Sequence, residues 1–257
     1  MKTIGSIILF SVLLISFMTG FGLSQEKKTP LIKHLASISF TGNSELPDFA
    51  SYTNTQQKKT DFFLYLLPKV TLANADIMKE RTWVTALNDN QTIEGSDLDE
   101  LLLLAKKYKV KTDQPKDIIE ALIVRIDIIP PSLVLAQAAN ESAWGTSRFA
   151  KQGNNLFGQW CYVKGCGIVP KGRAQGKTNE VASFKGVQQS VASYMRNLNS
   201  QYSYEFLREL RLKKREQNET VGGAYLAQGL IKYSTRREEY VKEIRAMIRQ
   251  NSLAQFD

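Results

Sequence analysis

The segment PSLVLAQAANESAWG, residues 131–145, constrains the fold more than any other part of the chain. Its apolar side chains fall on nearly every side of a helix: Leu133, Val134, Ala136, Ala138 and Ala139. A helix of that kind is buried, so we predict that it is the central helix of the fold. Ser132 is expected to cap this helix, and Gly145 is expected to end it.

Helical spacing of apolar residues continues on the N-terminal side. A helical pattern begins at Lys58 and is expected to be interrupted at Pro68, because proline breaks the hydrogen-bond ladder of a helix. Further helices are expected after a Ser96 cap and from Pro115, a favoured residue at the first helical position.

The C-terminal side changes character after Cys166. Residues 167–186 alternate short apolar pieces with glycines, which predicts a β-hairpin lobe with its turn near Ala174–Lys177. Helical patterns then resume, including the basic stretch RELRLKKREQ, which we interpret as a solvated helix face. The predicted fold class is mainly α: a helical domain with a small β-hairpin lobe.

A single acid, Glu141, lies in the last turn of the predicted central helix. Burial disfavours the charged form of a carboxylic acid and raises its pKa. An acid that stays protonated near neutral pH can donate a proton to a leaving glycosidic oxygen. The alternative is that Glu141 forms a salt bridge with Arg148 or points into solvent.

Histidine content excludes several other hydrolase classes. The one histidine, His34, precedes the helical body in the sequence, in a region typical of a linker. Zinc hydrolases need several ligands at set spacing, and Ser-His-Asp or Cys-His enzymes need a base beside the nucleophile. Acid–base chemistry in this chain would therefore rest on carboxylates, and no metal or organic cofactor is expected.

The first residues predict export. Lys2 precedes the uncharged run from Ile4 to Leu23, after which the sequence turns polar. This pattern is typical of a signal peptide, with a plausible cut after Ser24. The run is also long enough to span a bilayer, so attachment to the inner membrane through residues 4–23 stays open. Either way a periplasmic or cell-envelope location is expected.

Domain boundaries follow from these patterns. We predict a signal peptide or anchor over 1–24, an extended arm or linker over 25–57, a helical extension over 58–120 and a catalytic domain over 121–257. The net charge of +9 favours anionic partners. The basic residues are spread along the chain, so nucleic acid is not an expected partner, and we expect a monomer.

Two cysteines, Cys161 and Cys166, lie close together in WCYVKGCG. In an oxidising compartment a lone close pair usually forms a disulfide, which here would make a local turn rigid. A metal site would lack further ligands.

The stretch LAQAANESAWGTSRFAKQGNNLFG resembles the signature of glycoside hydrolase family 73, the bacterial N-acetylglucosaminidases of the lysozyme-like superfamily. That signature reads roughly A-x-x-E-S-x-W-G-x-S, followed after a gap by N-N-L-F-G. The run GQWCYVKGCGIVPKGR is closer still to the Bax-type members of that family. The resemblance extends over residues 122–248, so the N-terminal half falls outside it.

The resemblance implies roles for individual residues. Glu141 matches the glutamate that acts as the general acid. A second segment matches the floor of the sugar groove: Asn154, Asn155, Leu156, Phe157 and Gly158. The asparagine amides could bind acetamido groups. The alternative is that the same segment only forms a turn and fills the hydrophobic core. Trp144 and Trp160 could stack on sugars, and we expect Trp144 to be the buried one and Trp160 the binding one.

Two further groups are candidates for completing the reaction. The family places a second acid in the β lobe, where Glu180 is the available carboxylate. Tyr233 matches the tyrosine of the family's Y-A-T-D element, which here reads YSTR and lacks the acid. Tyr240 is a weaker alternative and is expected to pack.

The expected function is an exported endo-β-N-acetylglucosaminidase that cleaves peptidoglycan glycan strands. A lytic transglycosylase or muramidase of the same fold stays open, because a transglycosylase needs a single glutamate. An inactive cell-wall-binding protein is a further alternative, which the intact Glu141 argues against.

Overall fold

The computed structural model describes residues 45–88 and 92–257. The predicted signal peptide or anchor and His34 lie outside the described residues, as does the larger part of the predicted arm. No helix in the described ranges combines the length and apolar character needed to cross a membrane.

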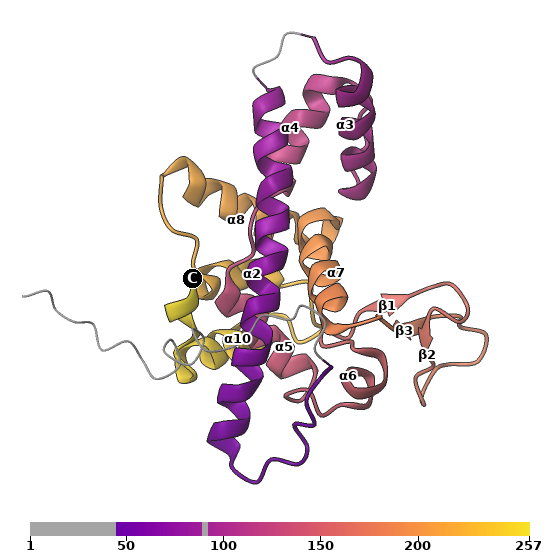
Figure 1. Cartoon of the computed structure of the whole chain (residues 1–257), viewed down its shortest axis with the longest axis vertical. Coiled ribbons are helices and arrows are strands. Elements are labelled where there is room, and N and C mark those ends of the chain that lie inside the picture. Colours follow the sequence, from indigo (N-terminus) through magenta and orange to yellow (C-terminus); the bar gives the residue numbers. More distant parts are fainter. Residues whose placement is uncertain (1–44, 89–91) are drawn as a thin grey trace, which may run out of the picture. The chain divides into compact units, whose positions relative to one another are not determined.

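Helices dominate the described chain, and a three-stranded sheet forms a small lobe (Figure 1). The α-helices are α2 Thr55–Leu87, α3 Gly95–Lys107, α4 Pro115–Arg125, α5 Pro131–Glu141, α6 Arg148–Gly153, α7 Val187–Ser200, α8 Glu205–Glu216, α9 Gly223–Leu226 and α10 Glu238–Gln250. Short 3-10 helices follow at η1 Tyr202–Tyr204, η2 Ala227–Leu230 and η3 Leu253–Phe256. The predicted fold class, a mainly helical lysozyme-like domain with a small β lobe, is confirmed.

Helix α5 lies at the centre of the packing. Every residue from Ser132 to Ala139 is buried, and α2, α9, α10 and η3 pack against the helix. The prediction of a buried central helix is therefore confirmed. Its C-terminal end carries Glu141, which is half-buried.

The caps of α5 differ from the predicted ones. Pro130 is the N-cap, and Ser132 lies in the first turn, where its N–H and hydroxyl donate to the Asp257 carboxylate at 2.9 and 2.7 Å. A distant carboxylate thus satisfies helix N-terminal donors. The helix ends at Glu141, before Gly145, because Ala143 and Trp144 already adopt left-handed backbone conformations.

Helix α2 runs without a break through Pro68, contrary to the predicted interruption (Figure 1). Buried side chains continue on both sides of the proline, among them Phe62, Leu66, Val70, Ala73, Ile77 and Val84. This face packs on α4, α5 and α7, and the packing offsets the cost of about 3 kcal/mol that an interior proline imposes. The helix begins at Thr55, with the Asn54 side chain accepting from the Gln57 N–H at 2.9 Å.

Two further start predictions have different outcomes. Helix α4 begins at Pro115 as expected. Helix α3 begins at Gly95 with Glu94 as its N-cap, so Ser96 is not the cap.

The basic stretch on α8 is not simply a solvated face. Arg208 and Arg211 are buried, and each guanidinium donates hydrogen bonds to backbone carbonyls. The Arg211 guanidinium donates to the carbonyls of Val124 and Arg125, which end α4 and lack helical partners. These two arginines therefore stabilise the packing of α8 and do not belong to a solvated basic surface.

The β lobe consists of β1 Trp160–Cys161, β2 Gly167–Ile168 and β3 Glu180–Ala182. The strand order is β1-β3-β2 with antiparallel pairing, and Cys161 lies opposite Glu180 across β1 and β3. A turn at Ala174–Lys177, closed by the Lys177 N–H to Ala174 carbonyl bond at 3.2 Å, lies between β2 and β3. The predicted hairpin is therefore present.

Candidate active site

A cleft of about 520 Å³ opens beside the end of α5 and is lined by Glu141. The segment from Phe157 to Tyr162, the polar face of α7, and two tyrosines, Tyr204 and Tyr233, form much of its wall. Glu141 is the one carboxylate among the residues that line this cleft. The acid predicted from the sequence thus lies in a cavity able to seat a ligand.

Glu141 is held through one of its two carboxyl oxygens. The Tyr240 hydroxyl donates to Oε1 at 2.7 Å, and Asn140 Nδ2 approaches the same atom at 3.5 Å. Burial raises the pKa of Glu141, although the bonds from Tyr240 and Asn140 partly oppose this. Glu141 forms no ion pair within the described ranges, and Arg148 instead donates to the Val169 carbonyl at 3.0 Å. The predicted environment for a proton donor is present at this position.

A chain of buried hydrogen bonds leads through Gln137 to Tyr240, the residue that donates to Glu141. Gln137 Nε2 donates to the Tyr240 hydroxyl at 2.9 Å, and Gln137 Oε1 accepts from the Tyr194 hydroxyl. Tyr194 also stacks on Phe157, with ring centroids 4.0 Å apart. This chain fixes the Tyr240 hydroxyl as a donor to Glu141 Oε1, so Oε2 is the carboxyl oxygen available to a ligand.

Tyr233 lines the same cleft, as the sequence led us to expect. Its hydroxyl donates to the Phe157 carbonyl at 2.8 Å, and its ring stacks on Tyr240 at 5.3 Å. Burial raises the pKa of Tyr233 well above its ordinary value. The phenol is therefore a neutral group that braces Tyr240 and the cleft floor, and its role in the reaction stays a prediction.

The predicted sugar-binding segment divides into two parts. Phe157, Gly158 and Trp160 line the cleft, and Trp160 is half exposed. Asn154, Asn155 and Leu156 do not line it.

These three residues instead serve local structure. Asn154 is the left-handed C-cap of α6 and donates to the Phe184 carbonyl at 3.0 Å. The buried Asn155 amide donates to the carbonyls of Gln159 and Ala182, each at 2.9 Å, and Leu156 is fully buried. Their contacts are those of a turn and of a side chain that fills the hydrophobic core. Direct sugar binding by these three residues stays a prediction without support from their positions.

Glu180 lies in the β lobe and is absent from the cleft lining. Its buried carboxylate accepts from the N–H groups of Gly165 and Gly167 at 3.0 and 2.9 Å. These bonds lower the pKa of Glu180, and Arg173 contributes a weaker effect in the same direction. The structure therefore gives Glu180 a structural task in the lobe, and its role as the second acid stays a prediction.

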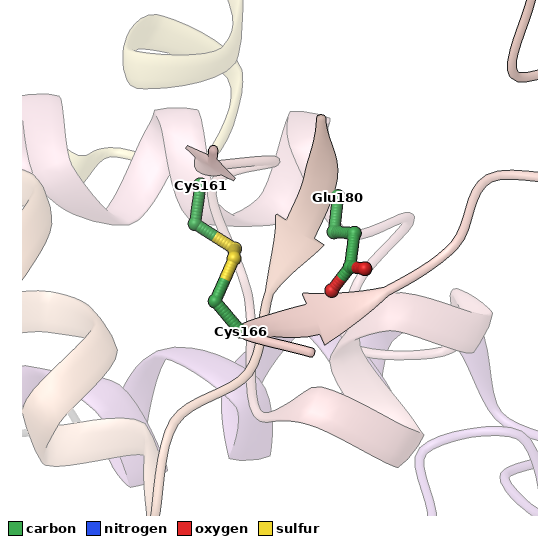
Figure 2. A group of neighbouring side chains, drawn as sticks. All are labelled: Cys161, Cys166 and Glu180. Carbon is green, nitrogen blue, oxygen red and sulfur yellow. A yellow bond between two sulfur atoms is a disulfide. The ribbon is translucent and has the colours of Figure 1, made fainter. Parts of the chain in front are cut away.

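A disulfide joins Cys161 to Cys166, as predicted. Figure 2 shows it beside the Glu180 carboxylate, and the ligand atoms of the three residues lie within 4.8 Å of one another. Because the sulfur atoms are bonded to each other and the carboxylate holds two N–H groups, we interpret the group as a brace for the loop between Tyr162 and Gly165.

Trp144 has a different place from Trp160. It is half-buried and packs edge-on against Phe62 and Phe63 of α2, at 5.7 and 5.3 Å. It is the less exposed of the two tryptophans, and the helix that covers it, α2, precedes α5 in the chain.

Several residues that line the cleft or contact its acid were not predicted from the sequence. Tyr240 was expected to pack, and its contact with Glu141 spans 99 positions in the sequence. Ser193, Asn197 and Ser200 line the cleft from α7. Their spacing places three polar residues on one face, beside the predicted apolar face, and this signal could have indicated a cleft wall.

The fold and the cleft together define a candidate glycosidase of the lysozyme-like class. The sequence model of the glucosaminidase family, described as mannosyl-glycoprotein endo-beta-N-acetylglucosaminidase, matches residues 116–253. Protein bax from Escherichia coli (strain K12) is 34% identical over 211 residues, which cover 81% of this chain and 75% of that protein. The chain belongs to the glucosaminidase family.

Among solved structures, the catalytic domain of the autolysin Auto from Listeria monocytogenes aligns with a TM-score of 0.41 and 20% identity. The alignment covers 81% of this chain and 92% of that chain.

Proposed function

We propose that this protein is an exported peptidoglycan hydrolase that cleaves the β-1,4 bond after N-acetylglucosamine, with Glu141 as the general acid. The main support for this proposal is the position of Glu141, whose side chain lines the cleft and whose pKa is raised by burial. Membership of the glucosaminidase family supports the bond type.

Glu141 would transfer its proton from Oε2 to the glycosidic oxygen while the bond from that oxygen to the anomeric carbon breaks. Water would then attack the anomeric carbon and release its proton to the solvent, from which the Glu141 carboxylate takes up a proton again, and this completes hydrolysis. The Tyr240 hydroxyl would stabilise the carboxylate that Glu141 becomes, because it donates to Oε1. Trp160 offers an exposed aromatic face for a sugar ring.

Peptidoglycan as the substrate rests on two features. The charge of +9 favours an anionic wall polymer, and the uncharged run from Ile4 to Leu23 favours export to it. Sequencing the N-terminus of envelope-associated protein tests export. Gln25 as the first residue would indicate a cleaved signal, and Met1 would indicate an anchor.

Lytic transglycosylation is a second candidate reaction. It is favoured by the cleft itself, where Glu141 is the one lining carboxylate and Glu180 is bound to Gly165 and Gly167. In that reaction the sugar's own hydroxyl replaces water, so one acid is sufficient.

Mass analysis of muropeptides tests both reactions. Purified peptidoglycan is incubated with the full chain, with Glu141→Gln and with buffer. Hydrolysis predicts products that have gained water and end in reducing N-acetylglucosamine, whereas reducing muramic acid would indicate a muramidase. Anhydro products would assign transglycosylation. No products from the wild-type protein, with binding retained, would favour a wall-binding protein.

A further inference from the structure

The cleft is not built by the family-matched region alone. That match begins at residue 116, yet Lys107, at the end of α3, and Lys109, just after it, also line the cleft. Arg196 of α7 is a third cation in the lining. The cleft thus combines three cations with a single carboxylate, Glu141.

Two of these cations carry charge that no neighbour neutralises. Lys107 forms a salt bridge with Glu80 of α2. Lys109 and Arg196 are exposed, and neither forms a salt bridge within the described ranges. Charged groups of one sign that line a cleft attract and orient ligand groups of the opposite sign.

The end of α3 is held in place by its own contacts. The buried Tyr108 hydroxyl donates to Glu80 at 2.7 Å, which ties this end of α3 to α2. The lysines on either side of Tyr108 are therefore presented by a fixed piece of backbone. A second hollow of about 360 Å³, lined by residues of α2, α3 and α7, shares Lys107 and Arg196 with the cleft. Lys107 and Arg196 therefore lie where the two hollows meet.

We infer that the N-terminal extension completes the groove with a cationic subsite, formed by Lys109 and Arg196, for a carboxylate carried by the glycan. This inference rests on the proposed function and adds a selection among glycans. Peptidoglycan carries carboxylates on its peptide stems, and a muramic acid whose stem has been removed exposes its lactyl carboxylate instead, because the stem is joined to that group through an amide bond. Chitin oligosaccharides have the same β-1,4 backbone but carry neither.

Binding measurements on the Glu141→Gln full chain test the subsite, because that background leaves the ligand intact. The ligands are three sugar chains of equal length: stem-bearing glycan, glycan whose stems an amidase has removed, and chitin oligosaccharide. The double variant Lys109→Gln/Arg196→Gln is compared with a control double variant, Lys106→Gln/Arg249→Gln. The second pair removes the same charge from exposed positions outside the cleft lining.

We expect the Lys109/Arg196 variant to bind anionic glycans about threefold to tenfold more weakly, with a smaller loss on the chitin oligosaccharide. The Lys106/Arg249 variant should keep its affinity. A loss restricted to the amidase-treated glycan assigns the lactyl carboxylate, a loss restricted to stem-bearing glycan assigns the peptide stem, and a loss on both shows that the subsite accepts either carboxylate.

An equal loss on all three ligands, or an equal loss in the control variant, would overturn the inference. A wild-type protein that binds these glycans but releases no products would refute the proposed hydrolase, while the charge selection would stand.

Discussion

The end of α5 and the β lobe each shield a glutamate from solvent, and the pKa values of the two acids move in opposite directions. Glu141 has a raised pKa, because burial dominates over the hydroxyl of Tyr240 and the amide of Asn140. Glu180 has a lowered pKa, because the N–H groups of Gly165 and Gly167 both donate to it.

The difference shows that the balance between burial and hydrogen-bond donors decides what a shielded carboxylate can do. Two backbone N–H groups at about 3 Å satisfy both oxygens of Glu180 and hold it ionised. Glu141 receives its donors on Oε1 alone, which leaves Oε2 able to hold a transferable proton. The first acid is suited to bracing a loop and the second to proton donation.

Asp127 agrees with this rule. It is buried, and burial alone would raise its pKa, but hydrogen bonds from Arg215 and the charges of Arg211 and Arg81 lower it. These arginines belong to α8 and α2, so the ionised Asp127 connects these two helices.

The largest expected effect separates the two glutamates by activity. Glu141→Gln should lower the rate of glycan cleavage by about 10²- to 10⁴-fold, the usual contribution of a general acid. Glu180→Gln should lower the cleavage rate less than about tenfold, because its effect would be confined to the structure of the β lobe. Both rates come from muropeptide release. A Glu180→Gln loss as large as that of Glu141→Gln, with an unchanged proteolysis pattern of the lobe, would break the comparison and make Glu180 the second acid.

Tyr240→Phe should change the pH dependence of the reaction. The Tyr240 hydroxyl lowers the pKa of Glu141, so its removal raises that pKa. Because the general acid must be protonated, activity is lost as pH rises through this pKa, and the basic limb of kcat/KM should move to higher pH. Gln137 also loses an acceptor, at a cost of about 1–3 kcal/mol.

Tyr233→Phe is the matched control for this limb, since its hydroxyl donates to the Phe157 carbonyl instead of Glu141. A limb that stays in place in Tyr240→Phe would show that Tyr240 does not tune Glu141.

Replacing both cysteines by serine should affect the lobe more than the acid. The Cys161–Cys166 disulfide closes a short loop, and its removal is expected to cost about 2 kcal/mol. Trp160 and Tyr162 flank Cys161 and line the cleft, so substrate binding should weaken while the pH profile stays unchanged. Denaturant unfolding and a KM-against-kcat comparison measure this. A moved pH profile would contradict the separation of the two regions.

The parts of the fold that the sequence predicted are those that depend on local pattern. The apolar residues around residues 131–139 required a buried helix, and the last turn of that helix fixed where Glu141 would lie. The Cys161–Cys166 pair and the turn near Ala174 were equally local.

The parts that it did not predict depend on contacts between distant residues. Ser132 bonds to Asp257 across 125 positions, and Tyr240 reaches Glu141 across 99. Pro68 stays within a helix because packing on α4, α5 and α7 outweighs its local cost. Glu180 was a candidate second acid, and its neighbours in the sequence gave no sign that Gly165 and Gly167 would donate to it.

The smallest expected effect is a difference in stability whose sign separates the two acids. A raised folded-state pKa means that stability is lost as pH rises above the unfolded value of about 4.3, so Glu141→Gln should melt at a higher temperature than wild type at neutral pH. A lowered pKa contributes stability above that value and loses it as pH falls, so Glu180→Gln should melt at a lower temperature. Both differences should shrink as pH falls below about 4, because both carboxyls then approach the neutral form. Thermal unfolding at neutral pH and at a pH below about 4 measures both differences. Shifts of the same sign at neutral pH would refute the claim that the balance between burial and donors distinguishes these two glutamates.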